Sequence, residues 1–242
     1  MPYEAHDDVQ TPEDDTLALW RYMDFTKFVS LLEDRAVYFA QLAVLAEDDP
    51  FEGSLSQPSI QEFVTAAKRE GLSPVDTEGR VRTTLQTYGM ARSLLYANCW
   101  HQNTVESAAM WKLYLQSGEG IAIRSSIGQL KASFSKSGRP VHVGMVQYID
   151  YDVDLTPIHN VIGLGLLKRK SFEHEREIRA LLFENEGPKG IKVHVDLETL
   201  IESIYVAPTA PAWLKSLVNN VVLRYELSIP VLQSALSQRA LY

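Results

Sequence analysis

Acidic and basic side chains that could bind a cationic, phosphate-bearing ligand are concentrated in residues 167–183, LKRKSFEHEREIRALLF. Successive side chains of a strand point to opposite faces, so a strand here would place Glu175, Glu177 and Arg179 on one face. Carboxylates on such a face could stabilise positive charge, and a guanidinium could bind phosphate. Alternating charges also protect the exposed edge of a sheet from pairing with another chain. The pattern leaves both interpretations open, a ligand site and a charged strand edge.

Two other places carry charges of interest. Arg21 is the one charged residue within residues 17–22, LALWRY, which are typical of a first strand. Its side chain could enter a site, or it could extend from an edge strand into solvent. Residues 47–53, EDDPFEG, contain four carboxylates around Pro50. This cluster could bind a divalent cation through oxygen ligands, or it could simply form a turn.

Cys99 is the only cysteine of the chain, which excludes an intrachain disulfide and a cysteine-based zinc cluster. We expect its side chain to be a buried small hydrophobe. Taking His101 to point to the opposite face of the strand, we predict no Cys-His nucleophile pair. The use of a single cysteine fits a reducing cytosol, so we expect a cytoplasmic protein.

The composition predicts one domain. The 242 residues are 45% hydrophobic and 22% charged, which is enough to bury one sizeable core. The net charge of −8 excludes a protein that coats nucleic acid nonspecifically, so any contact with nucleic acid would be local. We expect a flexible acidic arm over residues 1–15, with no signal peptide, and a single domain over residues 16–242. No apolar run is long enough to span a membrane.

Strands and helices are mixed without a strict βαβ alternation, so we predict an α+β fold with a mainly antiparallel central sheet surrounded by helices. Asp24 should cap a helix with apolar residues at helical spacing, and Tyr96, Asn98 and Trp100 should alternate with Ala97, Cys99 and His101. The expected strands are residues 17–22, 36–42, 96–101, 118–124, 141–148, 204–206 and 229–231, with a hairpin over residues 176–195. Residues 73–79 should form a polar loop. Helices are expected to begin at the capping signals Ser59 with Glu62, Asn103 with Glu106, Ser125 or Ser126, and Thr156 with Pro157. Residues 81–96 should be helical and lead into a strand. A late helix should have Trp213, Leu217, Val218 and Val221 on one face.

Short motifs spread over residues 17–233 resemble those of a bacterial domain-of-unknown-function family that is often found near mobile elements and defence genes. They are Trp20-Arg21-Tyr22, Val37-Tyr38-Phe39, Asp48-Asp49-Pro50-Phe51-Glu52, Met110-Trp111 with Tyr114, Gly120-Ile121-Ala122-Ile123, and Phe172-x-x-Glu175-x-Glu177-x-Arg179. The family usually has Asn where this chain has Asp48. The resemblance implies membership of the family and a role in bacterial defence or toxin biology, but no activity. We expect the stripe of Met110, Trp111 and Tyr114 to be core.

A first-strand Arg, a second strand reading Tyr-Phe-Ala and a late Glu-x-Glu strand also resemble the layout of ADP-ribosyltransferase-like folds. The resemblance implies an NAD-dependent ADP-ribosyltransferase-like enzyme or NAD glycohydrolase, with NAD as substrate. It assigns Glu177 to the reacting ribose and Glu175 to the acceptor side. It implies that Arg21 and Arg179 bind the cofactor and that Tyr22 or Tyr38 provides an aromatic face. The serine of the arginine-type transferases has no counterpart in Tyr38-Phe39-Ala40-Gln41.

Two other classes remain open. A metal-dependent nuclease could use Asp48, Asp49 and Glu52 with Glu175 or Glu177 and Lys170. Alternatively, a noncatalytic nucleotide-binding or interaction module would use the Arg and Glu residues only for buried ion pairs. The partners expected are a nucleotide or small-molecule ligand and a protein or nucleic-acid acceptor. The transferase hypothesis requires Arg21, Tyr38 and Glu177 to line one cleft, whereas the nuclease hypothesis requires the carboxylates to share one ion.

Overall fold

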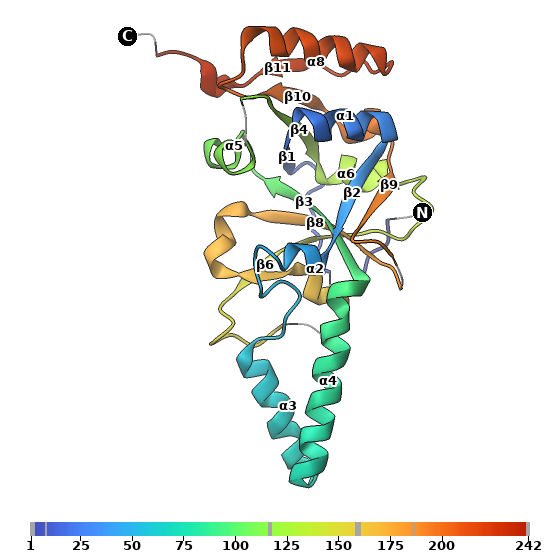
Figure 1. Ribbon diagram of the computed structural model, residues 1–242, viewed down its shortest axis with the longest axis vertical. Helices are drawn as coiled ribbons and strands as arrows, with labels where there is room; N and C mark the ends of the chain where they lie inside the picture. The colour runs from blue at the N-terminus through green and yellow to red at the C-terminus, as the bar shows by residue number, and fades with distance from the viewer. Residues whose placement is uncertain (1–2, 8, 116–117, 158–160, 186, 241–242) are drawn as a thin grey trace.

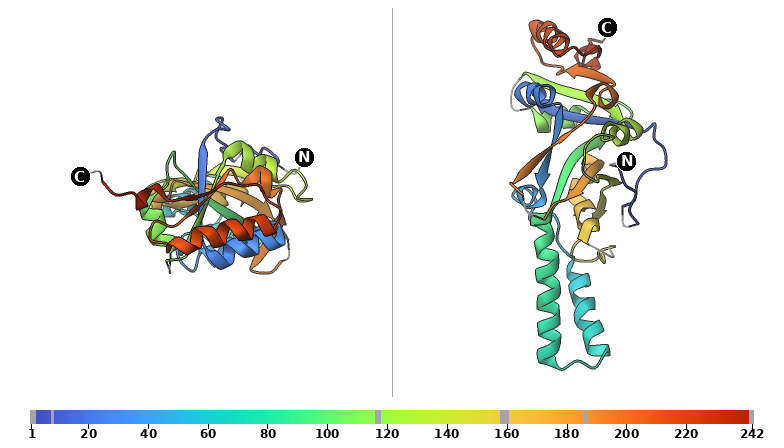
Figure 2. Two further views of the ribbon diagram at one scale, coloured as in Figure 1. Left: turned by 90° about the horizontal axis from the view of Figure 1, so that it is seen from above. Right: turned by 90° about the vertical axis from the view of Figure 1, so that its right-hand side faces the viewer.

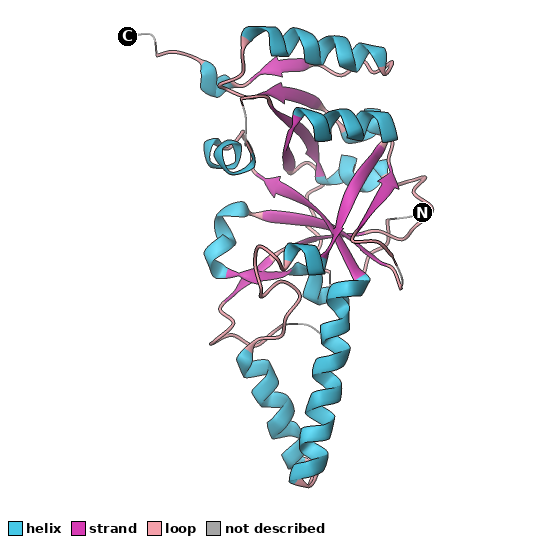
Figure 3. Ribbon diagram, in the orientation of Figure 1, coloured by secondary structure: helices cyan, strands magenta, loops and turns pink. Residues whose placement is uncertain are grey.

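The computed structural model describes residues 3–7, 9–115, 118–157, 161–185 and 187–240. A large sheet, mainly antiparallel, forms the centre of the molecule, and helices pack around it (Figures 1 and 3). The predicted α+β class is therefore confirmed. None of the helices in the described ranges is long and apolar enough to cross a membrane.

The strands of the large sheet occur in the order β11-β10-β4-β1-β3-β2-β9, and off this path β8 pairs with β3 while β5 pairs with β8. They are Ala18–Asp24 (β1), Ala36–Gln41 (β2), Leu95–Gln102 (β3), Gly120–Ser126 (β4), His142–Met145 (β5), Glu177–Phe183 (β8), Gly190–His194 (β9), Ser203–Val206 (β10) and Val231–Gln233 (β11). Among the described strands of this sheet, only β10 and β11 pair in parallel. A small parallel sheet joins Gln147–Ile149 (β6) to Leu167–Arg169 (β7).

The helices differ in how they contact this sheet. The α-helices are Phe25–Asp34 (α1), Leu42–Leu45 (α2), Gln57–Arg69 (α3), Pro74–Leu94 (α4), Ala108–Tyr114 (α5), Ile127–Ser133 (α6), Leu197–Leu200 (α7) and Ala212–Arg224 (α8). The 3-10 helices are Val161–Leu166 (η1), Lys170–Glu175 (η2) and Ala235–Ser237 (η3). Figure 2 shows α3 and α4 as an antiparallel pair that projects from one end of the sheet, while α8 lies at the other end. The molecule is therefore elongated.

Strand β3 organises the sheet because it pairs along both edges. On one edge β8 pairs with it from Leu95 to His101 without interruption. On the other edge β2 pairs only at Tyr96 and Ala97, and β1 pairs only at His101 and Gln102. Strands β1 and β2 thus diverge along β3, and residues 98–100 have no strand partner on that edge. This split gives the sheet an opening between β1 and β2.

The predicted alternation along β3 is confirmed. Tyr96 and Trp100 belong to the largest apolar cluster, which they share with α1, α6 and α8. Ala97 and Cys99 belong to or pack against a second cluster that includes residues of α4 and η1. Burying both faces of β3 fixes its register, because a shift by one residue would exchange the two sets of side chains. The split edge is therefore held by a rigid central strand.

The N-terminal segment packs along β5 in the described residues. Tyr3 bridges Val141, and the Glu4 amide donates to the Val141 carbonyl at 3.0 Å. Val9 is buried at 6% exposure against Gly144, where an added Cβ would come within 2.6 Å of a Val9 methyl. The acidic composition of residues 1–15 gave no sign of these contacts, since they depend on backbone hydrogen bonds and on the single apolar side chain of Val9.

Two local predictions are wrong, for different reasons. Strands β8 and β9 do not form a hairpin, because β8 pairs with β3 and β5 while β9 pairs with β2. The loop expected over residues 73–79 is the beginning of α4, where Ser73 is the N-cap and Pro74 occupies the first turn. The first error concerns long-range pairing, and the second missed a cap that the sequence contains.

Several expected caps are displaced by a few residues. Asp24 caps α1 by accepting from the Lys27 amide at 2.7 Å, as predicted, and Ser126 caps α6. However, α3 is capped by Ser56 rather than Ser59, and α5 is capped by Ser107 rather than Asn103. The late helix α8 buries a face of Leu214, Val218 and Val222, whereas Trp213 and Leu217 are exposed. The helix expected at Thr156 and Pro157 would include residues 158–160, which lie outside the described residues.

Candidate functional site

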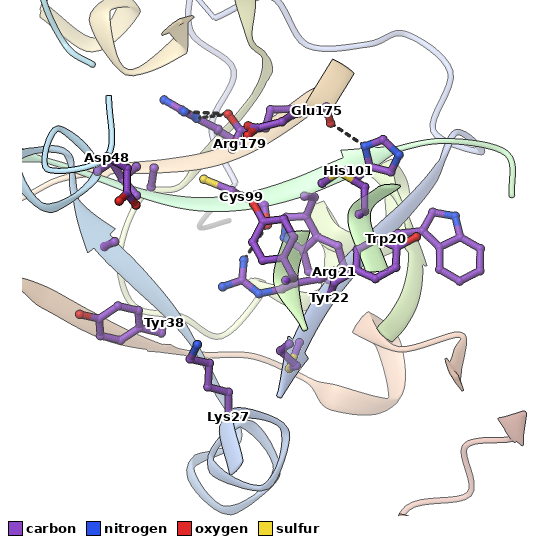
Figure 4. Close-up of a pocket in the computed structure, with 18 of the residues that line it drawn as sticks. Trp20, Arg21, Tyr22, Lys27, Tyr38, Asp48, Cys99, His101, Glu175 and Arg179 are labelled. Atoms are coloured by element: carbon purple, nitrogen blue, oxygen red, sulfur yellow. Dashed lines mark hydrogen bonds and ion pairs between the residues drawn. The ribbon is translucent and has the colours of Figure 1, made fainter. Parts of the chain in front are cut away.

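A pocket of about 610 Å³ lies where β1 and β2 separate from β3. This volume falls within the roughly 300–1,000 Å³ of small-molecule sites. All six predicted site residues line it, namely Arg21, Tyr22, Tyr38, Glu175, Glu177 and Arg179. The structure thus brings Arg21, Tyr38 and Glu177 to one cleft, as the transferase hypothesis requires. Figure 4 shows several of these side chains around the opening.

Glu175 reaches the pocket by a different route from the one predicted. It ends η2, and Arg176 then adopts a left-handed conformation with φ of +42° before β8 begins at Glu177. Glu175 and Glu177 are therefore not on one strand face. They nevertheless meet at the ammonium of Lys168, which lies 2.5 Å from Glu175 Oε2 and 3.4 Å from Glu177 Oε2.

Arg179 is fully buried and has no hydrogen-bond donor left for a ligand. Its Nε and Nη2 donate to Glu177 Oε2 at 3.1 and 2.7 Å. Its Nη1 and Nη2 donate to the two oxygens of Glu52 at 2.8 and 2.7 Å, and Nη1 also donates to the Gly165 carbonyl at 2.9 Å. These bonds use all N–H groups of the guanidinium. A direct contact between Arg179 and a cofactor does not fit this geometry, which instead makes Arg179 a positioning residue.

The charges at the base of the pocket set the ionisation of Glu177. Burial alone would raise the pKa of Glu177, but the charges of Arg179 and Lys168 outweigh burial and hold that pKa below its usual value. Burial and the charge of Glu177 raise the pKa of Glu175, against the effect of Lys168. Glu52, Glu175 and Glu177 are three carboxylates that share two cations, Lys168 and Arg179. With all three ionised, the cluster has one excess negative charge.

Arg21 lies in the split of the sheet, and its environment is different. Its Nη1 donates to the Cys99 carbonyl at 2.7 Å, a group that neither β1 nor β2 reaches as a strand partner. Its guanidinium lies 6.0 Å from the ring centroid of Trp100. Among the residues that the structure describes, no carboxylate pairs with Arg21. Burial lowers the pKa of Arg21, and its electrostatic interactions with Cys99, Tyr114 and Glu177 oppose this only in part.

The two tyrosines predicted to provide an aromatic face differ in access. Tyr22 is buried, its hydroxyl accepts from the Ser107 amide at 2.8 Å, and its ring packs edge-on against Trp111 at 4.9 Å. Tyr38 is 48% exposed, and its ring lies over Gly190, where an added Cβ would come within 1.8 Å of the tyrosine hydroxyl. Tyr38 is therefore the better placed of the two to stack with a ligand.

Lys168, Tyr114 and His101 line the pocket, although the sequence patterns did not assign them to it. Lys168 lies within the charged segment, but nothing in the segment distinguished it from Lys170. Tyr114 was expected in the core with Met110 and Trp111, yet it is 44% exposed and lines the pocket. His101 also lines it, with Nδ1 2.6 Å from the Glu175 carbonyl (Figure 4). That bond could not be predicted, since its partner is a backbone atom distant in the chain.

Cys99 is not a reactive thiol. Burial and the charge of Glu177 raise its pKa, so the thiol stays protonated. The reason given from the sequence was wrong, because Cys99 and His101 are two residues apart and share a strand face. Both line the pocket. However, Nδ1 of His101 bonds to the backbone carbonyl of Glu175 and not to the thiol of Cys99.

Of the carboxylates in the turn at residues 48–52, Glu52 approaches Glu175 and Glu177, as a shared metal ion would require. A cation already stands between them, since Lys168 Nζ also lies 3.7 Å from Glu52 Oε1. Asp49 forms an ion pair with Arg169, whose Nε lies 2.7 Å from Asp49 Oδ1. In the described part of the chain, no group of three or more His, Cys, Asp or Glu side chains could hold a metal ion. The geometry does not support the metal-dependent nuclease.

Comparisons with known proteins give a limited result. No protein-family model matches the chain, and no curated protein matches it. Among solved structures, the chain is similar to Thermus sp. 2.9 DarT in complex with ADP-ribosylated ssDNA, with 13% identity, a TM-score of 0.43, and coverage of 94% of this chain and 97% of that one. It is also similar to the same protein in complex with carba-NAD+, with 11% identity, a TM-score of 0.43, and coverage of 94% and 98%. At these values the likeness assigns neither a family nor an activity to this chain.

Proposed function

We propose that this protein cleaves the bond between nicotinamide and ribose in NAD, as an ADP-ribosyltransferase or as an NAD glycohydrolase. The observation that carries the proposal is the distribution of charge around the pocket. Within the described ranges, Arg21 on β1 is a cation without a carboxylate partner, whereas the cluster around Glu177 on β8 has one more carboxylate than cation. A ligand with an anionic diphosphate and a cationic reacting centre matches both charges.

In this proposal Glu177 stabilises the reacting ribose. Its Oε2 accepts from Arg179 and Lys168, and the thiol of Cys99 is the further donor beside this carboxylate. Because a carboxylate has about four acceptor sites, it can still accept from a ribose hydroxyl while its charge favours the oxocarbenium-like centre that forms as nicotinamide leaves. Arg179 and Lys168 keep the carboxylate ionised and fixed in place. Electrostatic preorganisation of this kind accounts for much of the rate enhancement of many enzymes.

The remaining residues bind and orient. Arg21 offers its unused N–H donors to the diphosphate or to the adenosine ribose. Tyr38 offers the exposed side of its ring to nicotinamide or adenine. Glu175, held by Lys168 through one oxygen, lies on the acceptor side and adds to the negative charge. The acceptor is water for a glycohydrolase and a protein or nucleic acid for a transferase.

The test is release of nicotinamide from NAD by the purified wild type and by Glu177→Gln. Gln keeps the shape and a hydrogen-bond acceptor but removes the charge, so we expect a rate about 10²- to 10³-fold lower. Glu202→Gln is the matched control, because Glu202 pairs with Arg124 at 2.6 Å and does not line the pocket. Single-stranded DNA, duplex DNA, RNA and a protein mixture are added in turn as acceptors.

Thermal melts establish that each variant is folded. If the wild type released no nicotinamide with any acceptor, the proposal would be overturned, and the ion cluster would be purely structural. Equal rates for the wild type and a folded Glu177→Gln protein would place catalysis elsewhere.

A further inference from the structure

His101 is a buried histidine with one ring nitrogen that has no partner. Its side chain is 4% exposed and lines the pocket. In the described structure Nε2 is buried and makes no hydrogen bond. Leaving a buried polar atom unpaired costs about 1–3 kcal/mol, so such an atom at a pocket wall points to a ligand group that pairs with it.

The contact of the other ring nitrogen fixes the tautomer. Nδ1 lies 2.6 Å from the carbonyl oxygen of Glu175. A carbonyl oxygen only accepts, so Nδ1 carries the proton, and Nε2 of the neutral ring has a free lone pair. Burial lowers the pKa of His101, the bond to Glu175 opposes this, and the charges of Arg176 and His174 lower it further. The ring is therefore neutral near pH 7.

The sheet register places this lone pair next to the proposed catalytic carboxylate. His101 on β3 is the antiparallel partner of Glu177 on β8, so the two side chains share one face of the sheet. On its other side His101 pairs with Trp20 of β1. The titratable and charged groups around His101 are Glu177 from β8, Glu175 and His174 from η2, Arg176 after it, and Tyr22 from β1, whose ring centroid is 6.4 Å away.

We propose that His101 is a catalytic residue, the general base that takes the proton of the attacking acceptor through Nε2. This inference rests on the proposed function. The oxygen or nitrogen atom of the acceptor forms a bond to ribose C1′ while the bond from C1′ to the nicotinamide nitrogen breaks. The electron pair of that bond neutralises the pyridinium, and the acceptor's proton moves to Nε2, giving an imidazolium that Glu177 stabilises. The proton then passes to solvent, which restores the neutral ring.

Other bases of the pocket are less suited to this step. Glu177 is held ionised by Arg179 and Lys168, and these contacts lower its basicity. Glu175 Oε2 accepts from Lys168 at 2.5 Å, so a proton arriving there would displace an ion pair. Nε2 has no such contact to lose.

The experiment compares His101→Asn with His142→Asn. Asn retains an N–H close to the position of Nδ1, which can still bond to Glu175, but has no counterpart of Nε2. His142 is a matched control, because it is buried at 9% exposure, its Nδ1 lies 2.7 Å from the Glu4 carbonyl, and it does not line the pocket. We expect His101→Asn to lower the rate of nicotinamide release with acceptor about 10²- to 10⁴-fold. His142→Asn should retain the wild-type rate.

The pH profile separates a base from a residue that only supports the fold. Wild-type activity should fall as the pH drops through the pKa of His101, which is lowered from 6.5, because the ring then becomes protonated. This acid limb should be absent in His101→Asn and present in Glu175→Gln. If Glu175→Gln removed the limb and His101→Asn kept it, Glu175 would be the base and the proposal would be overturned. His101→Gln replaces Asn if the first variant does not fold.

Nitrogen NMR of the histidine rings gives a readout that does not depend on turnover. A proton on Nδ1 of His101 in the free wild type, with a shift of the Nε2 signal on adding NAD, is expected. A proton on Nε2 would overturn the assignment whatever the activity. Absence of nicotinamide release by the wild type overturns the proposed function and this role with it. An active wild type with equal rates for the two Asn variants overturns the role of His101 alone.

Discussion

Two arginines line the same pocket from strands on either side of β3, and their surroundings shift their pKa values in opposite directions. Arg179 on β8 is fully buried between Glu52 and Glu177, whose charges raise its pKa well above the usual value against the effect of burial. Arg21 on β1 bonds to one backbone carbonyl, and burial lowers its pKa. A guanidinium whose donors are all used fixes the structure. One with donors to spare and no counter-ion is available to an anion.

The difference originates in the sheet. Arg179 lies where β8 pairs continuously with β3 and with β5, so its side chain is enclosed by neighbouring elements. Arg21 lies where β1 leaves β3, one residue beyond the last pair at Trp20 and His101. The opening left there is lined by the acidic cluster on one side and by Arg21 on the other. The topology therefore determines which arginine can meet a ligand.

The largest expected effect is on folding, from Arg179→Met. This change leaves Glu52 and Glu177 buried with only Lys168 to compensate, and breaking a buried pair in this way costs about 3–5 kcal/mol. The measurement is the free energy of unfolding in urea. A loss below about 1 kcal/mol would contradict the structural role. Adding Glu52→Gln to Arg179→Met removes one stranded charge, so the double variant should recover part of the loss.

The pH dependence of stability is a control for the effect of Arg179→Met. The pKa of Glu177 is held below the usual 4.5, so its ionised form contributes stability above about pH 4.5 that is lost as the pH falls through the lowered pKa. The raised pKa of Glu175 acts in the opposite sense, with stability present below 4.5 and lost as the pH rises through the raised value. In Arg179→Met the acid loss due to Glu177 should shrink, because the charge that lowers its pKa is gone.

Arg21→Ala should affect binding much more than folding. It removes hydrogen bonds to a charged ligand group, each worth about 1.5–3 kcal/mol, so the KM for NAD should rise about 10- to 100-fold. The free energy of unfolding should fall by only about 1 kcal/mol, since one carbonyl loses its donor. Arg124→Ala is the control on the neighbouring strand β4, where the arginine pairs with Glu202 outside the pocket. Unchanged KM with Arg21→Ala would remove the ligand role of this residue.

Local patterns predicted the elements better than their partners. The β1 and α1 boundary was predictable because Asp24 caps the helix through its own side chain. Glu175 was wrongly predicted to lie on the strand face of Glu177, because Arg176 between them adopts a left-handed conformation. A Gly at this position would have indicated such a conformation, but an Arg does not. The site residues could be named by type and order, since charges inside apolar segments are unusual. The sequence could not show which site residues have all their hydrogen bonds used within the protein and which remain free for a ligand. That distinction depends on contacts such as the one between Glu52 and Arg179, which are 127 residues apart.

The smallest expected effect tests the edge of the pocket next to Arg21. Tyr38→Ala should weaken NAD binding by about 0.5–1.5 kcal/mol, because it removes an aromatic face, whereas Tyr38→Phe should bind as the wild type does. Gly190→Ala sharpens this test, since a methyl group there would meet the Tyr38 ring and displace it without changing its chemistry. The measurement is NAD affinity by calorimetry. Loss of affinity in Tyr38→Ala and Gly190→Ala together would place the ligand on this ring, while loss in neither would confine binding to the Arg21 and Glu177 side.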